Sequence, residues 1–137
     1  MDEAHKIFKR LLTANNCVLA TVSKNGKPEI AFMQFALDDN ENILLKTFND
    51  SRKYENISEN SFASICIYNK PDYVQMDGTV VELTHENANQ AKENLVTKYG
   101  EDGYFSDHRL RFIKFIPTWI RVRLTGEYPP RYETIKD

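Results

Sequence analysis

Residues 17–37 read CVLATVSKNGKPEIAFMQFAL. Two strand-like runs, residues 17–23 and 28–37, are joined by Lys24-Asn25-Gly26-Lys27. Asn-Gly is the dipeptide favoured in a two-residue type I′ turn, because both of its residues tolerate positive φ. The stretch therefore predicts an antiparallel β-hairpin, and the remaining elements are predicted by working outward from it.

Five more strand-like runs follow the hairpin, after a polar turn at residues 38–42. They are residues 43–47, 62–69, 73–83, 109–116 and 118–124. Gly78 interrupts the longest run and predicts a bulge or a sharp bend. Pro117 separates the last two runs. The tail from Glu127, which contains Pro129-Pro130, is not expected to form a central strand, because proline lacks an N–H.

Three helices are predicted among these strands. Residues 2–15 form an amphipathic helix with one apolar stripe. Ser51 is a suitable N-cap for a second helix at residues 52–60. A third helix begins at Thr84 or His85 and ends at Gly100, and residues 101–108 form a polar loop. Six or seven mostly antiparallel strands with peripheral helices indicate an α+β barrel rather than a doubly wound sheet.

The bulk properties exclude several classes of function. With 137 residues the chain fits a single domain, residues 1–137, and its net charge of −2 provides no general attraction for nucleic acid or an anionic membrane. No run approaches the ~18 apolar residues of a membrane span, so we expect a cytoplasmic protein. Cys17 and Cys66 lie in apolar runs and are interpreted as inert core thiols. The three histidines lack ligand spacing, so no metal is predicted.

Residues 44–53 run from a strand through a loop into a helix start. Such a junction offers free backbone amides and the positive end of a helix dipole. Thr47 and Ser51 add hydroxyls, and Arg52 and Lys53 add positive charges that suit a phosphate. The alternative is that Ser51 only caps the helix while the two basic side chains are solvated.

Together with its neighbours, this junction resembles the pyridoxamine 5′-phosphate oxidase-like family of FMN-binding split barrels. The resemblance spans about residues 16–84 and rests on pieces in a fixed order. They are LATV at 19–22, NGKP at 25–28, LD at 37–38, ILLKT at 43–47, SRK at 51–53, Asn60 and VQMDG at 74–78. It implies a dimeric split β-barrel that binds flavin mononucleotide (FMN).

The resemblance also implies which residues hold the cofactor's phosphate. Thr47, Ser51, Arg52 and Lys53 match the phosphate-binding positions of the family. Lys46 lies beside Thr47 in the same phosphate and ribityl region.

Other positions are implied to lie along the flavin itself. Phe32, Met33 and Gln34 belong to the strand that runs beside the flavin. Part of their implied contact with the flavin is made by backbone amides. A glutamine of the family contacts the cofactor from the Gly78 strand. The matching position is Tyr73, and the contact is assigned to Gln75, which lies on the same face of the strand.

The last predicted strand has two different faces. Ile120, Val122 and Leu124 share one face, which leaves Trp119 and two arginines on the other. Trp and Arg are enriched at protein interfaces, so this face indicates a homodimer contact; the alternative is an exposed strand. Since the family places two flavins at its dimer interface, the resemblance implies that Trp119 reaches the partner's cofactor.

The function implied is that of an FMN-dependent oxidoreductase of unknown substrate, similar to the general-stress and nitroimidazole-resistance branches. Vitamin B6 oxidation is not expected, because residues 108–111 read HRLR and lack the family's Arg-Leu-x-His element. Haem degradation is not expected either, since no histidine follows His108. Three alternatives stay open: a non-catalytic flavin-binding or ligand-sensing dimer, a relative that uses the deazaflavin F420, and an empty structural dimer.

Overall fold

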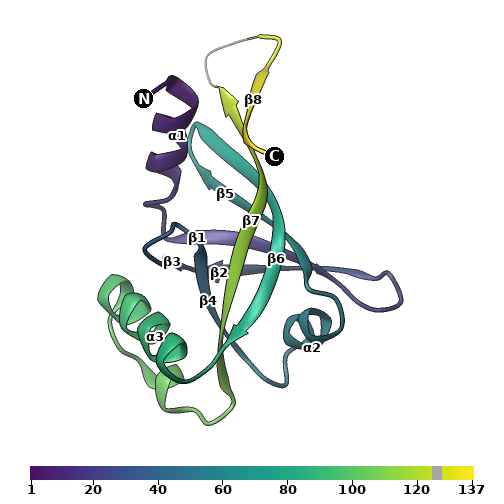
Figure 1. Ribbon diagram of the computed structural model, residues 1–137, viewed down its shortest axis with the longest axis vertical. Helices are drawn as coiled ribbons and strands as arrows, with labels where there is room; N and C mark the ends of the chain where they lie inside the picture. The colour runs from purple at the N-terminus through teal and green to yellow at the C-terminus, as the bar shows by residue number, and fades with distance from the viewer. Residues whose placement is uncertain (125–127) are drawn as a thin grey trace.

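The computed structural model describes residues 1–124 and 128–137. This part of the chain holds one antiparallel sheet, three α-helices and a short 3₁₀ helix (Figure 1). The strands are β1 (Asn16–Val22), β2 (Pro28–Gln34), β3 (Ala36–Leu37), β4 (Ile43–Phe48), β5 (Phe62–Asn69), β6 (Asp72–Leu83), β7 (Leu110–Leu124) and β8 (Arg131–Lys136). The helices are α1 (Glu3–Leu11), α2 (Arg52–Glu59), α3 (His85–Tyr99) and the 3₁₀ helix η1 (Gly103–Ser106).

The sheet has the order β2-β1-β5-β6-β7-β4-β3, with β8 beside β7. It curls, so that β1 and β2 run across the direction of β6 and β7 (Figure 1). The curled sheet encloses a core whose largest buried side chains include Phe35 and Phe115, and α1 buries Ala4, Phe8 and Leu11 in the same cluster. The predicted α+β split β-barrel with peripheral helices is confirmed.

The predicted hairpin forms, but its turn differs from the prediction. β1 and β2 pair antiparallel, with Val22 opposite Pro28. The backbone bonds Ser23 N–H to Lys27 O (2.9 Å) and Gly26 N–H to Ser23 O (2.9 Å) close a three-residue loop. Gly26 alone in the loop has positive φ (+81°). The type I′ prediction was therefore wrong, because such a turn needs positive φ at two residues. Here a single glycine with positive φ closes the loop, in the manner of a G1 bulge.

The predicted strand at residues 28–37 is divided at Phe35. Its N–H donates to Tyr99 Oη (3.1 Å), and its carbonyl accepts from Tyr99 Oη (2.6 Å) and Lys98 Nζ (2.9 Å). Side chains of α3 thus replace the sheet partners at this residue. The chain changes partner here, since β2 pairs with β1 whereas β3 pairs with β4.

The two strands predicted on either side of Pro117 are one continuous strand, β7. β4 pairs with β7 only up to Phe115, and β8 pairs with it only from Ile120 onward. Pro117 therefore lies where β6 is the sole neighbour among the described strands, and a residue without an N–H is tolerated there. The register of β6 and β7 shifts between Asp77 and Gly78, which confirms the bulge predicted at Gly78.

The remaining elements agree with the sequence in outline. Ser51 caps α2 by accepting from Tyr54 N–H (3.2 Å), and α3 ends at Gly100 with φ of +86°. η1 forms within the predicted loop 101–108. Glu127, where the predicted tail begins, lies outside the described residues, while the rest of the tail adds the unpredicted strand β8, which pairs only with β7.

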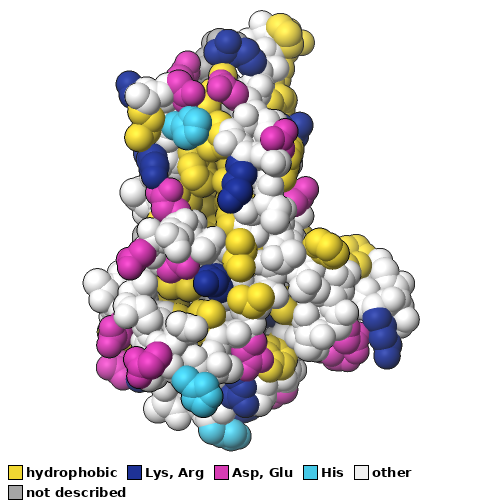
Figure 2. All heavy atoms as spheres, in the orientation of Figure 1, with side chains coloured by type: hydrophobic (Ala, Val, Ile, Leu, Met, Phe, Trp, Pro, Cys, Tyr) yellow, Lys and Arg dark blue, Asp and Glu magenta, His cyan; other side chains and the backbone are white. Residues whose placement is uncertain are grey.

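The thiols and the surface complete this description. Cys17 is buried, and burial raises its pKa to about 12. Cys66 is half-buried, so its assignment to the core was wrong, because it alternates with the buried Ile65 and Ile67. Figure 2 shows basic and acidic side chains mixed over one face of the molecule. None of the helices in the described ranges is long and apolar enough to span a membrane.

The β6–β7 contact provides a test of the fold. A Cβ atom on Gly78 would lie 2.2 Å from Ile116 O, which is backbone and has little freedom to move. We expect Gly78→Ala to lower the free energy of unfolding by about 1–3 kcal/mol, as overpacking does. Gly103→Ala is the matched control, since nothing lies within 4 Å of its Cβ position. Urea denaturation measures both, and equal stability of the two variants would contradict the close contact.

Candidate functional site

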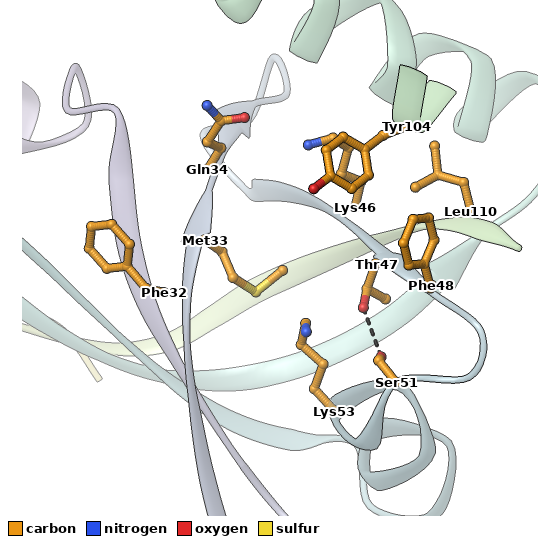
Figure 3. A pocket seen from close by; sticks show the side chains of 10 residues that line it. All are labelled: Phe32, Met33, Gln34, Lys46, Thr47, Phe48, Ser51, Lys53, Tyr104 and Leu110. Carbon is orange, nitrogen blue, oxygen red and sulfur yellow. Dashed lines mark hydrogen bonds between the residues drawn. The ribbon is translucent and has the colours of Figure 1, made fainter. Parts of the chain in front are cut away.

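A cavity of about 260 Å³ opens between β2, β4, the start of α2 and the segment that contains η1 (Figure 3). It is lined by Phe32, Met33, Gln34, Lys46, Thr47, Phe48, Ser51, Lys53, Tyr104 and Leu110. The structure thus brings together Phe32, Met33, Gln34, Lys46, Thr47, Ser51 and Lys53, which are seven of the ten site residues predicted from the sequence.

One end of the cavity is suited to an anion. Thr47 is buried at the end of β4, and its hydroxyl lies 2.9 Å from that of Ser51. Lys53 extends from the first turn of α2 into the same space (Figure 3). The first N–H groups of a helix lack intrahelical acceptors and carry a partial positive charge. This end therefore offers hydroxyl, amide and ammonium donors over a short distance.

A buried hydrogen bond holds α2 in place for this role. Asn56 Nδ2 donates to Thr21 Oγ1 on β1 (3.1 Å), and both side chains are buried. A buried amide that lost this partner would incur a desolvation penalty, so the bond favours one position of the helix on the sheet. The helix start is fixed relative to β1 and, through the hairpin, to β2.

The wall along β2 offers backbone as well as side chains. β2 lies at one end of the strand order and pairs only with β1 among the described strands. The other edge of β2 therefore has N–H and C=O groups free for a ligand. Met33 projects toward Thr47 and Lys53, whereas Phe32 points away from them on the other side of the strand (Figure 3).

Three predicted site residues lie outside this cavity. Arg52 is about 80% exposed, and its Nε donates to Glu29 Oε1 (3.1 Å) instead. Gln75 accepts a hydrogen bond from Arg121 Nη2 (2.6 Å). Trp119 is half-buried beside the same arginine, whose Cζ lies 5.4 Å from the indole ring.

The wall opposite β2 was missed by the sequence analysis. It consists of Phe48, Tyr104 and Leu110. Leu110 reaches the cavity because it pairs with Phe48 across β4 and β7. The ring of Tyr104 lies 5.6 Å from that of Phe48, and Lys46 Nζ lies 5.2 Å from its centroid. No local pattern signals this wall, because it forms from segments about 60 residues apart.

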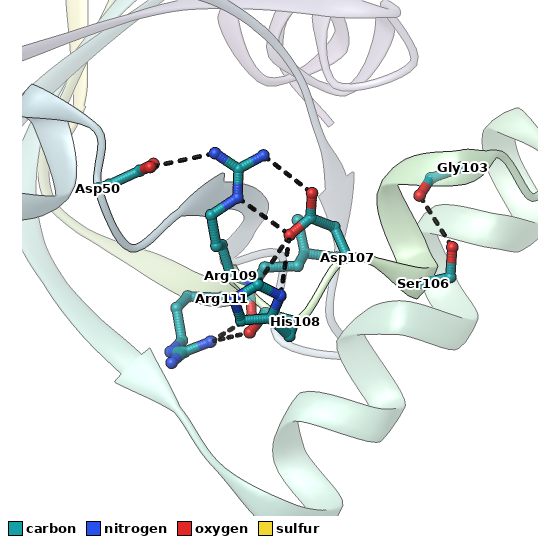
Figure 4. A network of polar contacts seen from close by, with 8 residues as sticks. Asp50, Gly103, Ser106, Asp107, His108, Arg109 and Arg111 are labelled. Atoms are coloured by element: carbon teal, nitrogen blue, oxygen red, sulfur yellow. Dashed lines mark hydrogen bonds and ion pairs between the residues drawn. The ribbon is translucent and has the colours of Figure 1, made fainter.

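A network of charged groups supports that wall (Figure 4). Arg109 donates through Nε and Nη2 to the two oxygens of Asp107 (3.1 and 2.9 Å), and through Nη1 to Asp50 Oδ2 (3.1 Å). Hydrogen bonds from the Arg109 side chain and backbone lower the pKa of Asp107 to about 2. Asp107 therefore stays charged at neutral pH, and the single Arg109 guanidinium bridges it to Asp50.

The outer face of the sheet next to the cavity exposes several large apolar side chains. Ile30 and Phe32 on β2 are 72% and 76% exposed, and Phe62 on β5 is 68% exposed. Across the strands, Phe32 is followed by Val18, Cys66, Gln75 and Arg121 in one row. The face thus runs continuously from the cavity edge to the predicted Trp119 face.

The curled sheet and its edge cavity define the chain as a split-barrel protein. Its sequence shows which family this is: the sequence model of the pyridoxamine 5′-phosphate oxidase family matches residues 1–124, so the chain belongs to that family. No curated protein matches the chain significantly in sequence.

Solved structures resemble the chain at low sequence identity. A protein of unknown function from Agrobacterium tumefaciens has a TM-score of 0.81 at 12% identity, over 88% of this chain and 56% of its own. A heme binding protein from Mycobacterium smegmatis has a TM-score of 0.80 at 18% identity, over 99% and 59%. A pyridoxamine 5′-phosphate oxidase-related, FMN binding protein from Nostoc punctiforme has a TM-score of 0.69 at 14% identity, over 100% and 98%. The chain spans less than two thirds of the first two proteins.

Metal ligands are not gathered at this site. Within residues 1–124 and 128–137, no group of three or more His, Cys, Asp or Glu side chains is arranged to hold a metal ion. No histidine lines the cavity. The cavity instead offers hydroxyl, amide and ammonium donors together with aromatic rings, which suit an anionic organic ligand.

The Arg109 network can be tested by titration. Since Arg109 favours the charged form of Asp107, the carboxylate's contribution to stability is present above an ordinary carboxyl pKa and is lost as the pH falls through about 2. We expect carbon-13 NMR to give Asp107 a pKa of about 2, and Arg109→Gln to return it toward the ordinary ~3.9. Arg111→Gln, whose guanidinium bonds backbone carbonyls, should leave it unchanged. An ordinary pKa in the unaltered protein would contradict the network.

Proposed function

We propose that this chain binds FMN in the cavity and acts as an FMN-dependent oxidoreductase. The observation that carries the proposal is that the Thr47 and Ser51 hydroxyls and the Lys53 side chain line one end of the same cavity, at the start of α2 and beside the open edge of β2. FMN has a dianionic phosphate and a flat ring with hydrogen-bonding edges, and these two parts match the two ends of the site.

The phosphate would be held by donors of three kinds. The Thr47 and Ser51 hydroxyls, the first free amides of α2 and the Lys53 ammonium all favour a negatively charged group. Arg52 contributes from outside the cavity, because its side chain is turned toward Glu29. This makes Lys53 the principal charged phosphate ligand in our proposal.

The ring would lie along β2. The unpaired N–H and C=O groups of this edge strand can bond acceptors and donors at the edge of the flavin ring. FMN supplies the electron transfer when bound, and the side chains around it orient the ring, exclude water and adjust its affinity for electrons. The substrate is open, since the family fold accommodates different reactions.

A homodimer completes the proposed site. The cavity of about 260 Å³ is smaller than typical sites for ligands of this size, which are roughly 300–1,000 Å³. The exposed Ile30 and Phe32 extend the cavity edge onto an apolar sheet face that favours contact with a second copy. We propose that the partner subunit's Trp119 covers the part of the ligand that protrudes, and that Gln75 acts by holding Arg121 on this face.

FMN binding can be tested by quenching of flavin fluorescence. We expect the protein to bind FMN, and Lys53→Ala to weaken binding by about 1.5–3 kcal/mol, or roughly ten- to a hundredfold, as loss of a charged hydrogen bond does. Arg52→Ala should have a smaller effect. Riboflavin, which lacks the phosphate, is the control ligand, and its affinity should not depend on Lys53. Equal FMN affinity in Lys53→Ala would remove the phosphate assignment.

The cofactor and its use can be separated in the same preparation. Mass spectrometry of the ligand released on denaturation distinguishes FMN from F420 and from heme. Reduction of bound FMN by NADH or NADPH without oxygen supports the oxidoreductase. If neither NADH nor NADPH reduces the bound flavin, the non-catalytic alternative is favoured.

The dimer can be tested by sedimentation. We expect a dimer for the unaltered chain and a monomer for Ile30→Glu, because a charge on the apolar face is unfavourable when buried without a partner. Val81→Glu is the matched control, since Val81 is a 41% exposed apolar residue that lies on β6 opposite Lys114, away from Gln75 and Trp119. A monomeric unaltered protein, or a dimeric Ile30→Glu variant, would contradict the interface.

A further inference from the structure

The segment that carries η1 is not explained by the family resemblance, yet it lines the cavity. Tyr104 is 54% exposed, and its hydroxyl makes no hydrogen bond within the described part of the chain. Its ring packs against Phe48 and lies under the ammonium group of Lys46. The ring of Tyr104 is thus supported by Phe48 and Lys46, and its hydroxyl is accessible from the cavity.

The position of this ring depends on Arg109. The 3₁₀ helix ends with Asp107 N–H donating to Tyr104 O (3.1 Å), and Asp107 is gripped at both oxygens by the Arg109 fork. Two parallel hydrogen bonds between Arg and a carboxylate define orientation as well as distance. The guanidinium therefore sets where the end of η1, and with it Tyr104, lies.

The same arginine also holds residues 47–51, the turn proposed to bind the phosphate and called the phosphate turn below. Its third donor reaches Asp50, which lies between Thr47 and Ser51, and its carbonyl accepts from Asn49 N–H (2.8 Å). Its Cζ lies 4.3 Å from the centroid of the Phe48 ring. Without this cation, the charges of Asp50 and Asp107 would be left uncompensated beside a site that receives a dianion. One side chain thus serves two walls of the cavity without lining it.

We propose that Tyr104 contacts the bound flavin from the side opposite β2, and that Arg109 is the positioning residue that holds Tyr104 and the phosphate turn in register. This assignment rests on the proposed FMN site and extends it to a wall formed by residues 103–110. Tyr104 belongs to the binding surface, whereas Arg109 acts through Asp107, Asp50 and Phe48.

A double-mutant cycle tests the assignment. We expect Tyr104→Leu and Arg109→Gln each to weaken FMN binding about tenfold and to change the visible circular dichroism of the bound flavin in the same sense. Because Arg109→Gln already displaces the wall to which Tyr104 belongs, the double variant should bind only slightly more weakly than Arg109→Gln alone. Arg111→Gln is the control and should bind FMN with unchanged affinity and spectrum. Arg109→Lys keeps the charge but loses the fork, so we expect an intermediate affinity.

The outcomes separate this inference from the proposed function. If the unaltered protein binds no flavin, the proposed function fails and the inference fails with it. If the unaltered protein binds FMN but Arg109→Gln has the same affinity and the same flavin spectrum, only the inference is overturned. Fully additive losses in the double variant would also overturn it, because they would show that the two residues act independently. Should Arg109→Gln not fold, Asp107→Asn weakens the same Arg109–Asp107 contact by removing the carboxylate charge. It is expected to give the same spectral change.

Discussion

The close approach of β6 and β7 at Gly78 is the constraint on which the rest of the structure depends. A side chain there would meet Ile116 O at 2.2 Å, so only glycine permits the contact. The register shift at this point divides β7 into two working halves. The first half pairs with β4 and carries Leu110 to the cavity, and the second carries Trp119 and Arg121 on the outer face. Both parts of the proposed flavin site are therefore placed by one backbone contact.

The parts of the site that could be predicted from the sequence are those encoded locally. Thr47, Ser51 and Lys53 lie within seven consecutive residues, and a cap residue at a strand-to-helix junction brings them together. The hairpin was predictable for the same reason, because its turn and its two strands adjoin. Residues 32–34 lie opposite this junction only through the fold, and the family resemblance supplied that placement.

What the sequence could not provide depends on distant partners. Arg52 turns away from the cavity because Glu29, at the start of β2, offers it a carboxylate. Tyr104 reaches the cavity because β7 pairs with β4, a contact between segments that share no local signal. Pro117 was predicted to end a strand, but the effect of a proline depends on which neighbours are present at that point of the sheet.

The open edge of β2 connects ligand binding with assembly. An exposed edge strand bearing Ile30 and Phe32 is a liability, because it can pair or aggregate with other chains. A flavin along its backbone and a second copy over its apolar face would each cover part of this edge. If the partner subunit's Trp119 also contacts the flavin, binding of flavin must favour the dimer by the same factor by which the dimer favours flavin. The open edge of β2, which makes the isolated chain prone to aggregation, is then also the feature that couples flavin binding to dimerisation.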